Sequence, residues 1–213
     1  MFQYEHVTAG HLDMLKEIGN IGAGHAATAL SEMLGKTIDM NVPSVRVVPF
    51  NHICDAVGGD EEPVTAVFLR IEGDAPGSMY FMMPAAEGSR LIGQLLNDSG
   101  IDFLSNEPNA MGRSALNEVG NILAGAYLSS LSDFTALNLK PTPPALAVDM
   151  AMAVLSFGLI EISKAGDYAI VIDTEISETG SDNALRTKGH FFLLPDPDSL
   201  EAVFHSLGVN ENG

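Results

Sequence analysis

LKEIGNIGAG at residues 15–24 returns as LNEVGNILAG at residues 116–125. Around these stretches one sparse polar pattern occurs twice, with each position of the second copy 101 residues after its counterpart. The first copy consists of Asp13, Glu17, Asn20 and, after 22 intervening residues, Pro43; the second consists of Ser114, Glu118, Asn121 and Pro144. A polar pattern repeated with identical spacing indicates two copies of one site rather than a chance arrangement on a solvated helix face.

Both copies lie in segments of helical periodicity. Apolar side chains recur at spacings of three and four over residues 8–34 and 108–134, which predicts two long amphipathic helices. Thr8 and Asn106 are suitable N-caps, with Pro108 near the first turn of the second helix. At about 100° per residue, each polar triplet falls on one side of its helix, away from the leucines. We therefore expect the triplets to face solvent or a partner.

After each long helix the pattern changes to strands and then to a second helix. The segments expected to be strands are 36–50, 64–72, 77–83, 168–176 and 188–194, with a turn at 73–77; the second helices are expected at 85–97 and 196–207, and a short extra helix at 145–159. Strand edges left open by each half would be protected by joining into one sheet. The predicted fold is α/β (α+β): residues 1–213 form one pseudo-two-fold domain, made of repeats 8–99 and 107–208. Its central mixed or antiparallel sheet is flanked by the two motif-bearing helices.

Composition excludes several classes of function. The net charge of −18 repels phosphate backbones and anionic lipid, so neither nucleic acid nor a membrane surface is an expected partner. No apolar run reaches the roughly 18 residues of a membrane span, and residues 1–13 lack the features of a signal peptide. Cys54 is the only cysteine, which fits a reducing compartment. We expect a cytoplasmic protein.

The repeated triplet has limited chemistry of its own. It places no nucleophile beside a base, and the histidines show no metal-ligand spacing with each other or with Cys54, so we expect no bound metal or cofactor. GAGHAA at 22–27 resembles a dinucleotide-binding loop, but helical sequence precedes it and Leu123 replaces its first glycine in the second copy. A Glu–Asn pair suits a simpler task, in which the amide places a water molecule and the carboxylate pairs with a partner's cation.

Glycines within the two helices need an explanation, because a mid-helix glycine costs about 1 kcal/mol relative to alanine. For Gly22, close packing against the sheet and access for a partner are both open. Gly19 and Gly120 adjoin the asparagines directly. There we expect access for a partner.

On these motifs the chain resembles the CheC family of chemotaxis phosphatases, which includes CheX and FliY. The family pattern is Asp or Ser, three residues, Glu, two residues, Asn, about 22 residues and Pro, and both copies match it. The resemblance implies hydrolysis of the phosphoaspartate of the response regulator CheY. It implies that Asn20 and Asn121 orient the water, that Glu17 and Glu118 pair with a lysine of the regulator, and that the Mg²⁺ belongs to the regulator.

The resemblance also implies supporting residues and a second partner. Asp13 and Ser114 would support the glutamates, while Pro43 and Pro144 would shape the neighbouring strand. The receptor deamidase CheD would bind and regulate the protein, docking around residues 145–155. One alternative is a binding module that sequesters CheD or phosphorylated CheY without catalysis. Another, a structural component of the flagellar switch, is weakened because the chain has no room for a switch-binding domain.

Overall fold

The computed structural model describes residues 7–105, 109–162, 168–179, 186–196 and 199–207; the side chains of 157–162 are not described. In chain order its elements are α1 (Ala9–Leu34), β1 (Ile38–Asn41), β2 (Val45–Pro49), the 3₁₀ helix η2 (Phe50–Val57), β3 (Pro63–Gly73), β4 (Gly77–Pro84), α2 (Ala85–Leu96), α3 (Ala110–Thr135), β5 (Leu139–Pro141), β6 (Ala145–Met150), α4 (Ala151–Ile162), β7 (Tyr168–Glu178), β8 (Arg186–Pro195) and α5 (Ser199–Ser206). The two long helices, the hairpins and the second helices lie where periodicity predicted them, so the expected α/β architecture is confirmed.

One antiparallel sheet holds all of the described strands, in the order β1-β7-β8-β4-β3-β5. At one edge β1 and β2 both pair with β7, and at the other β5 and β6 both pair with β3. The outer strands of the first half, β1 and β2, therefore pair with β7 of the second half. The outer strands of the second half, β5 and β6, pair with β3 of the first half. Because each half supplies the outer strands of the other, the two halves share one sheet.

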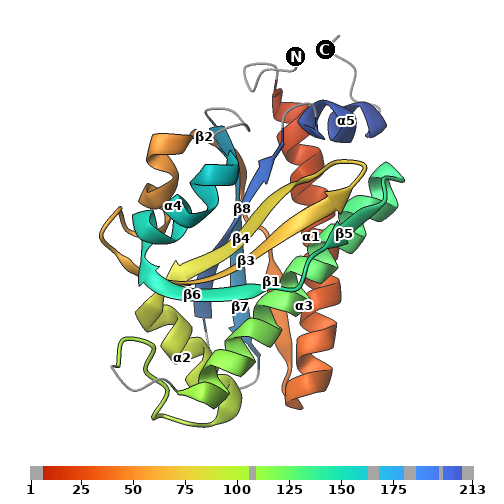
Figure 1. Ribbon diagram of the computed structural model, residues 1–213. Coiled ribbons are helices and arrows are strands. Elements are labelled where there is room, and N and C mark those ends of the chain that lie inside the picture. Colours follow the sequence, from red (N-terminus) through yellow and green to blue (C-terminus); the bar gives the residue numbers. More distant parts are fainter. Residues whose placement is uncertain (1–6, 106–108, 163–167, 180–185, 197–198, 208–213) are drawn as a thin grey trace.

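Two hydrophobic cores lie on opposite faces of this sheet. Helices α1 and α3 lie side by side over one face, with α2 and α5 near their ends (Figure 1), and the larger core fills the space beneath them. Helix α4 and η2 cover the other face, where a smaller core includes Tyr80, Phe192 and Leu155. The motif-bearing helices thus present their remaining surface away from the sheet.

Helix α1 begins and ends as its sequence suggests, whereas α3 begins later than expected. The Thr8 hydroxyl accepts the His11 N–H, and Gly35 ends α1 with a φ of 62°. The cap of α3 is Asn109, whose side chain accepts the Gly112 N–H at 2.7 Å. This placement corrects the choice of Asn106 as the N-cap; Asn106 and Pro108 themselves lie outside the described residues.

The expectation of an extra helix over residues 145–159 is wrong in its first part. Residues 145–150 form β6, which pairs with β3 from Phe68 to Pro63, and α4 begins only at Ala151. The apolar character that suggested a helix reflects a strand held against β3. The helix is also not an addition to the second half, because η2 follows β2 in the first half as α4 follows β6. Among the described residues, no helix is long and apolar enough to cross a membrane.

Candidate functional site

Helix α1 presents the first copy of the motif. Leu15 and Ile18 are fully buried in the larger core and fix which side of the helix faces the sheet. Asp13 and Glu17 consequently lie on the exposed side. As expected from the helical spacing, this carboxylate pair faces solvent.

Helix α3 presents the second copy in the same way. Leu116 and Val119 are buried, while Ser114, Glu118 and Asn121 are all exposed. Within the described part of the chain, the side chains of Glu118 and Asn121 form no hydrogen bond or ion pair. A free carboxylate and a free carboxamide, one helical turn apart, are thus available to an approaching molecule.

Asn20, by contrast, is held by its own chain. Its Nδ2 donates to the carbonyl oxygens of Lys16 at 3.0 Å and Val42 at 3.4 Å. Its Oδ1 accepts the N–H of Val42 at 2.9 Å. The amide of Asn20 therefore forms hydrogen bonds with both the N–H and the carbonyl oxygen of Val42, in the segment between β1 and β2. The motif itself, which is the same at both asparagines, did not predict this difference between them.

The motif prolines follow the ends of the outer strands. Pro43 lies between β1 and β2, and Pro144 lies between β5 and β6. A proline has no N–H and favours extended backbone, so it suits the point at which an edge strand is interrupted. Their expected role in shaping the strand remains a prediction.

The glycines beside the asparagines do not provide access to a partner, which corrects that expectation. A Cβ on Gly120 would come within 2.5 Å of a methyl carbon of Val67, so this glycine lets α3 approach the sheet. A Cβ on Gly19 would lie 3.2 Å from Val42 and 3.3 Å from Tyr127. Both are buried against neighbouring residues.

The other helix glycines divide between packing and exposure. A Cβ on Gly22 would lie 3.0 Å from the Cα of Tyr127, so its contact is with α3 rather than with the sheet. Gly24 and Gly125 have open space around them, and they extend the motif faces of α1 and α3. The glycine-rich segment 22–27 is helical throughout, which agrees with the rejection of a dinucleotide loop.

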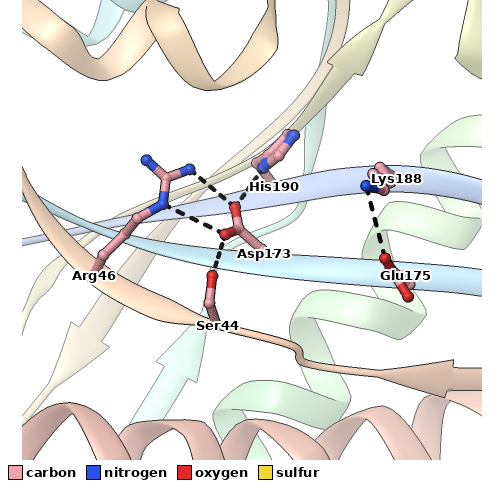
Figure 2. A network of polar contacts seen from close by, with 6 residues as sticks. All are labelled: Ser44, Arg46, Asp173, Glu175, Lys188 and His190. Atoms are coloured by element: carbon pink, nitrogen blue, oxygen red, sulfur yellow. Dashed lines mark hydrogen bonds and ion pairs between the residues drawn. The ribbon is translucent and has the colours of Figure 1, made fainter.

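A polar network that sequence reasoning missed lies on the face of the sheet opposite to α1 and α3 (Figure 2). Asp173 on β7 accepts hydrogen bonds from Ser44 and from Arg46, and its carboxylate lies 2.8 Å from Nδ1 of His190. Burial alone would raise the pKa of Asp173, but hydrogen bonds from His190, Arg46 and Ser44 and the charge of Arg46 hold it well below its usual range. One signal was present: Asp173 interrupts the apolar run of β7.

The described residues contain no group of three or more His, Cys, Asp or Glu side chains that could hold a metal ion. Cys54 is buried, and burial, together with a hydrogen bond to Asp60, raises the pKa of its thiol to about 12. The thiol is therefore protonated and poorly suited to be a nucleophile. The accessible chemistry of the motif faces is that of carboxylates and amides.

Comparisons with known proteins match both motif regions. The model of the CheC-like family matches residues 11–47 and 111–148, which run from each motif helix to just beyond its proline. The chain is 44% identical over 199 residues to CheY-P phosphatase CheC of Bacillus subtilis (strain 168), an alignment that covers 93% of this chain and 94% of that protein. It is 28% identical over 135 residues to flagellar motor switch phosphatase FliY of the same strain, covering 62% of this chain and 34% of FliY.

Solved structures share the fold at lower identity. FliY of Thermotoga maritima superposes with a TM-score of 0.74 and 20% identity, covering 95% of this chain and 98% of that one. The middle domain of FliM from H. pylori gives a TM-score of 0.67 at 11% identity, covering 94% and 99%. The 44% identity over nearly the whole length, together with the family match at both motif copies, shows that the chain belongs to the CheC-like family.

Proposed function

We propose that this chain hydrolyses the phosphoaspartate of a CheY-type response regulator. The observation that carries the proposal is the exposed, unpaired Glu118–Asn121 face of α3, in a chain 44% identical to a protein named CheY-P phosphatase. That face was predicted to place no nucleophile beside a base, and the described residues contain no metal-binding cluster, so it needs a partner that supplies both the phosphoryl group and the cation. A phosphorylated regulator with its own Mg²⁺ supplies both.

The proposed chemistry is a direct attack by water. The water oxygen forms a bond to phosphorus as the bond from phosphorus to the aspartyl oxygen breaks, which releases phosphate and leaves a carboxylate. The carboxamide of Asn121 donates and accepts hydrogen bonds, so it can hold that water in line with the breaking bond. Glu118, one turn away, can pair with a lysine of the regulator and fix the approach of the helix. This chain then contributes positioning, and the regulator contributes the electrostatics.

The experiment is the decay of phosphorylated CheY with and without the chain. We expect the wild type to accelerate the loss of phosphate, and the Asn20→Ala/Asn121→Ala double variant to lose that effect. Asn51→Ala is a matched control, because Asn51 is an exposed asparagine of η2, on the far side of the sheet. A double variant with full activity would refute the site. Tight binding of the phosphorylated regulator without faster decay would favour the alternative, a sequestering module.

A second part of the proposal concerns CheD. The segment that the family resemblance indicates, residues 145–155, is β6 followed by the first turn of α4. Met150, where the two meet, is 53% exposed and gives this corner an apolar contact point. Calorimetry with purified CheD tests the assignment, and we expect Met150→Glu to weaken binding. Unchanged binding by that variant would place the contact elsewhere.

A further inference from the structure

The two copies of the motif differ at the residue before the proline. Val42 precedes Pro43 in the first copy, and Pro143 precedes Pro144 in the second. The position is 22 residues after the motif asparagine in both copies, so Val42 and Pro143 are counterparts. Val42 has a backbone N–H and Pro143 has none. This single difference decides whether the asparagine can be held by the segment that follows β1 or β5.

In the first copy the asparagine is occupied. Oδ1 of Asn20 accepts the Val42 N–H at 2.9 Å, while its Nδ2 is shared between two carbonyl oxygens. Both N–H groups of this amide are directed at backbone carbonyl oxygens, so it has no donor left for a water molecule on a partner's phosphoryl group, and its Oδ1 keeps one lone pair. To act there, Asn20 would first have to break its bonds to Val42, which would leave the N–H of that buried residue unpaired.

In the second copy the corresponding bond cannot form. Pro143 offers no N–H to Oδ1 of Asn121, and Asn121 is exposed with no hydrogen bond to a described residue. Its amide is already free to donate to and accept from a partner. A group that is free before the encounter can bind the water molecule without first losing an internal hydrogen bond.

The segment after β1 is also fastened from the other face of the sheet (Figure 2). Ser44 donates its hydroxyl to Asp173, and its carbonyl oxygen accepts the Asp173 N–H at 3.0 Å. Arg46 and His190 complete the contacts to that carboxylate. Strand pairing gives the counterparts of Ser44, Arg46, Asp173 and His190 as Ala145, Ala147, Phe68 and Tyr80. These four residues cannot form the same side-chain network. The segment of the second copy is joined to β3 differently, through Thr142, whose N–H donates to the Arg70 carbonyl oxygen at 2.8 Å and whose hydroxyl accepts the Arg70 N–H at 3.0 Å.

The exposed surfaces of α1 and α3 also differ, and this difference again favours the second copy. Met111, two turns before Glu118 on the same side of α3, is 69% exposed. Its counterpart in α1 is Gly10, which has no side chain to offer. An exposed methionine on the same side of the helix as the Glu–Asn pair adds apolar contact area for a partner protein. The second copy is therefore better equipped to dock a partner as well as to act on it.

We propose that the two copies are unequal: the Glu118–Asn121 face is the open reaction site, and the Glu17–Asn20 face is held closed by Val42. The residue before the motif proline sets the difference, with Val42 closing one copy and Pro143 keeping the other open. This inference rests on the proposed hydrolysis of phosphoaspartate. The hydrogen bonds between Asn20 and Val42, called the clamp below, can be measured without any assay of hydrolysis.

Hydrogen exchange of the Val42 amide, followed by NMR in the absence of any partner, measures the clamp directly. Asn20→Ala should speed this exchange, because it removes the acceptor of the Val42 N–H, while Asn121→Ala should not. In the phosphate-decay assay, Asn121→Ala should reduce the acceleration by about 100-fold, the scale for losing one positioned hydrogen-bonding group at a reaction centre. Asn20→Ala should reduce it far less.

Exchanging the residues before the prolines tests the cause. Pro143→Val supplies the missing N–H and should slow phosphate decay, whereas Pro141→Val makes the same chemical change at an exposed position in β5 and should not. Val42→Pro in the Asn121→Ala background should restore part of the lost activity. Val42 is buried, so replacing it by proline changes the packing as well as the hydrogen bond. Pro143 is exposed, and Pro143→Val is therefore the decisive variant.

The outcomes separate the two levels of the proposal. Equal losses from Asn20→Ala and Asn121→Ala, or full activity of Pro143→Val, would overturn the inequality of the copies and leave the phosphatase proposal standing. Val42 exchange that is unaffected by Asn20→Ala would overturn the clamp itself. A wild-type chain that does not accelerate decay would defeat the proposed function, while the exchange measurement would still decide whether Asn20 holds Val42.

Discussion

Replacing two glycines of α3 by alanine, one at a time, tests how closely this helix lies on the sheet. Gly120 and Gly125 are both in the helix interior, five residues apart, so either change should gain the same intrinsic helix propensity of about 1 kcal/mol. Their surroundings differ. A Cβ on Gly125 meets nothing within 4 Å, whereas a Cβ on Gly120 would lie 2.5 to 2.7 Å from three side-chain carbons of Val67.

The geometry gives the size of the difference. Gly125→Ala should stabilise the protein by about 0.5 to 1 kcal/mol, because the propensity gain is opposed by no contact. Gly120→Ala makes the same gain but overpacks the helix–sheet interface, at a cost of about 1 to 3 kcal/mol. Val67 is β-branched and 3% exposed within β3, so it has little room to move aside. The alanine at 120 should therefore leave the protein less stable than the alanine at 125 by about 1 to 3 kcal/mol.

Urea unfolding and thermal melting measure this difference. For a chain of this length, 1 kcal/mol corresponds to roughly 2 to 4 °C in melting temperature, so the two variants should melt about 2 to 12 °C apart. Combining Gly120→Ala with Val67→Ala removes the opposing methyl groups, and the cost of the glycine substitution should shrink. Equal stability of the two alanine variants would refute the close approach of α3 to β3 at Gly120.

Two further predictions concern ionisable groups that are partly or fully buried. Because the folded-state pKa of Asp173 is lowered, its contribution to stability is full above the unfolded value of about 4 and is lost as the pH falls below it. Asp173→Asn should accordingly lower the free energy of unfolding by about 1.5 to 3 kcal/mol near neutral pH. In urea unfolding, this difference from the wild type should become smaller at acid pH. A difference that does not depend on pH would contradict the charged network. Cys54 is 2% exposed, and its thiol has a pKa of about 12. It should therefore react with a thiol reagent at mildly alkaline pH only when urea unfolds the chain. Rapid labelling of the folded protein would contradict its burial.

Periodicity and turn residues predicted most elements, because each depends on neighbours in the chain. The leucine spacing of α1 and α3, the turn at 73–77 and Pro84 are local signals that the structure follows, whereas α5 begins at Ser199, three residues after the start expected from Pro195. The apolar segment 145–159 failed because apolar character alone does not distinguish a buried helix from a strand. Its first six residues are a strand only because β3 offers them an open edge. Nothing local in that segment identifies its partner strand.

In the site too, features that depend on the helix sequence were predictable, and features that depend on contacts with distant residues were not. Helical spacing was sufficient to place Glu17 and Glu118 on exposed faces, since it depends on α1 and α3 alone. The state of the asparagines was not predictable in this way. Asn20 differs from Asn121 through a hydrogen bond to Val42, which lies beyond the end of the helix. The contrast between Val42 and Pro143 was visible in the sequence, but its meaning required the contact.

The exchange of outer strands explains why the two copies can differ in state while sharing one motif. The segment that holds Asn20 lies between β1 and β2, and both of these strands pair with β7 of the second half. Asp173, which fastens Ser44, also belongs to β7. The segment that closes the first copy is thus held in place by a strand of the other half, and changes in either half can alter it. A duplication built in this way can keep the same Glu–Asn pair in both copies and still change the state of one of them, through residues that lie outside the motif.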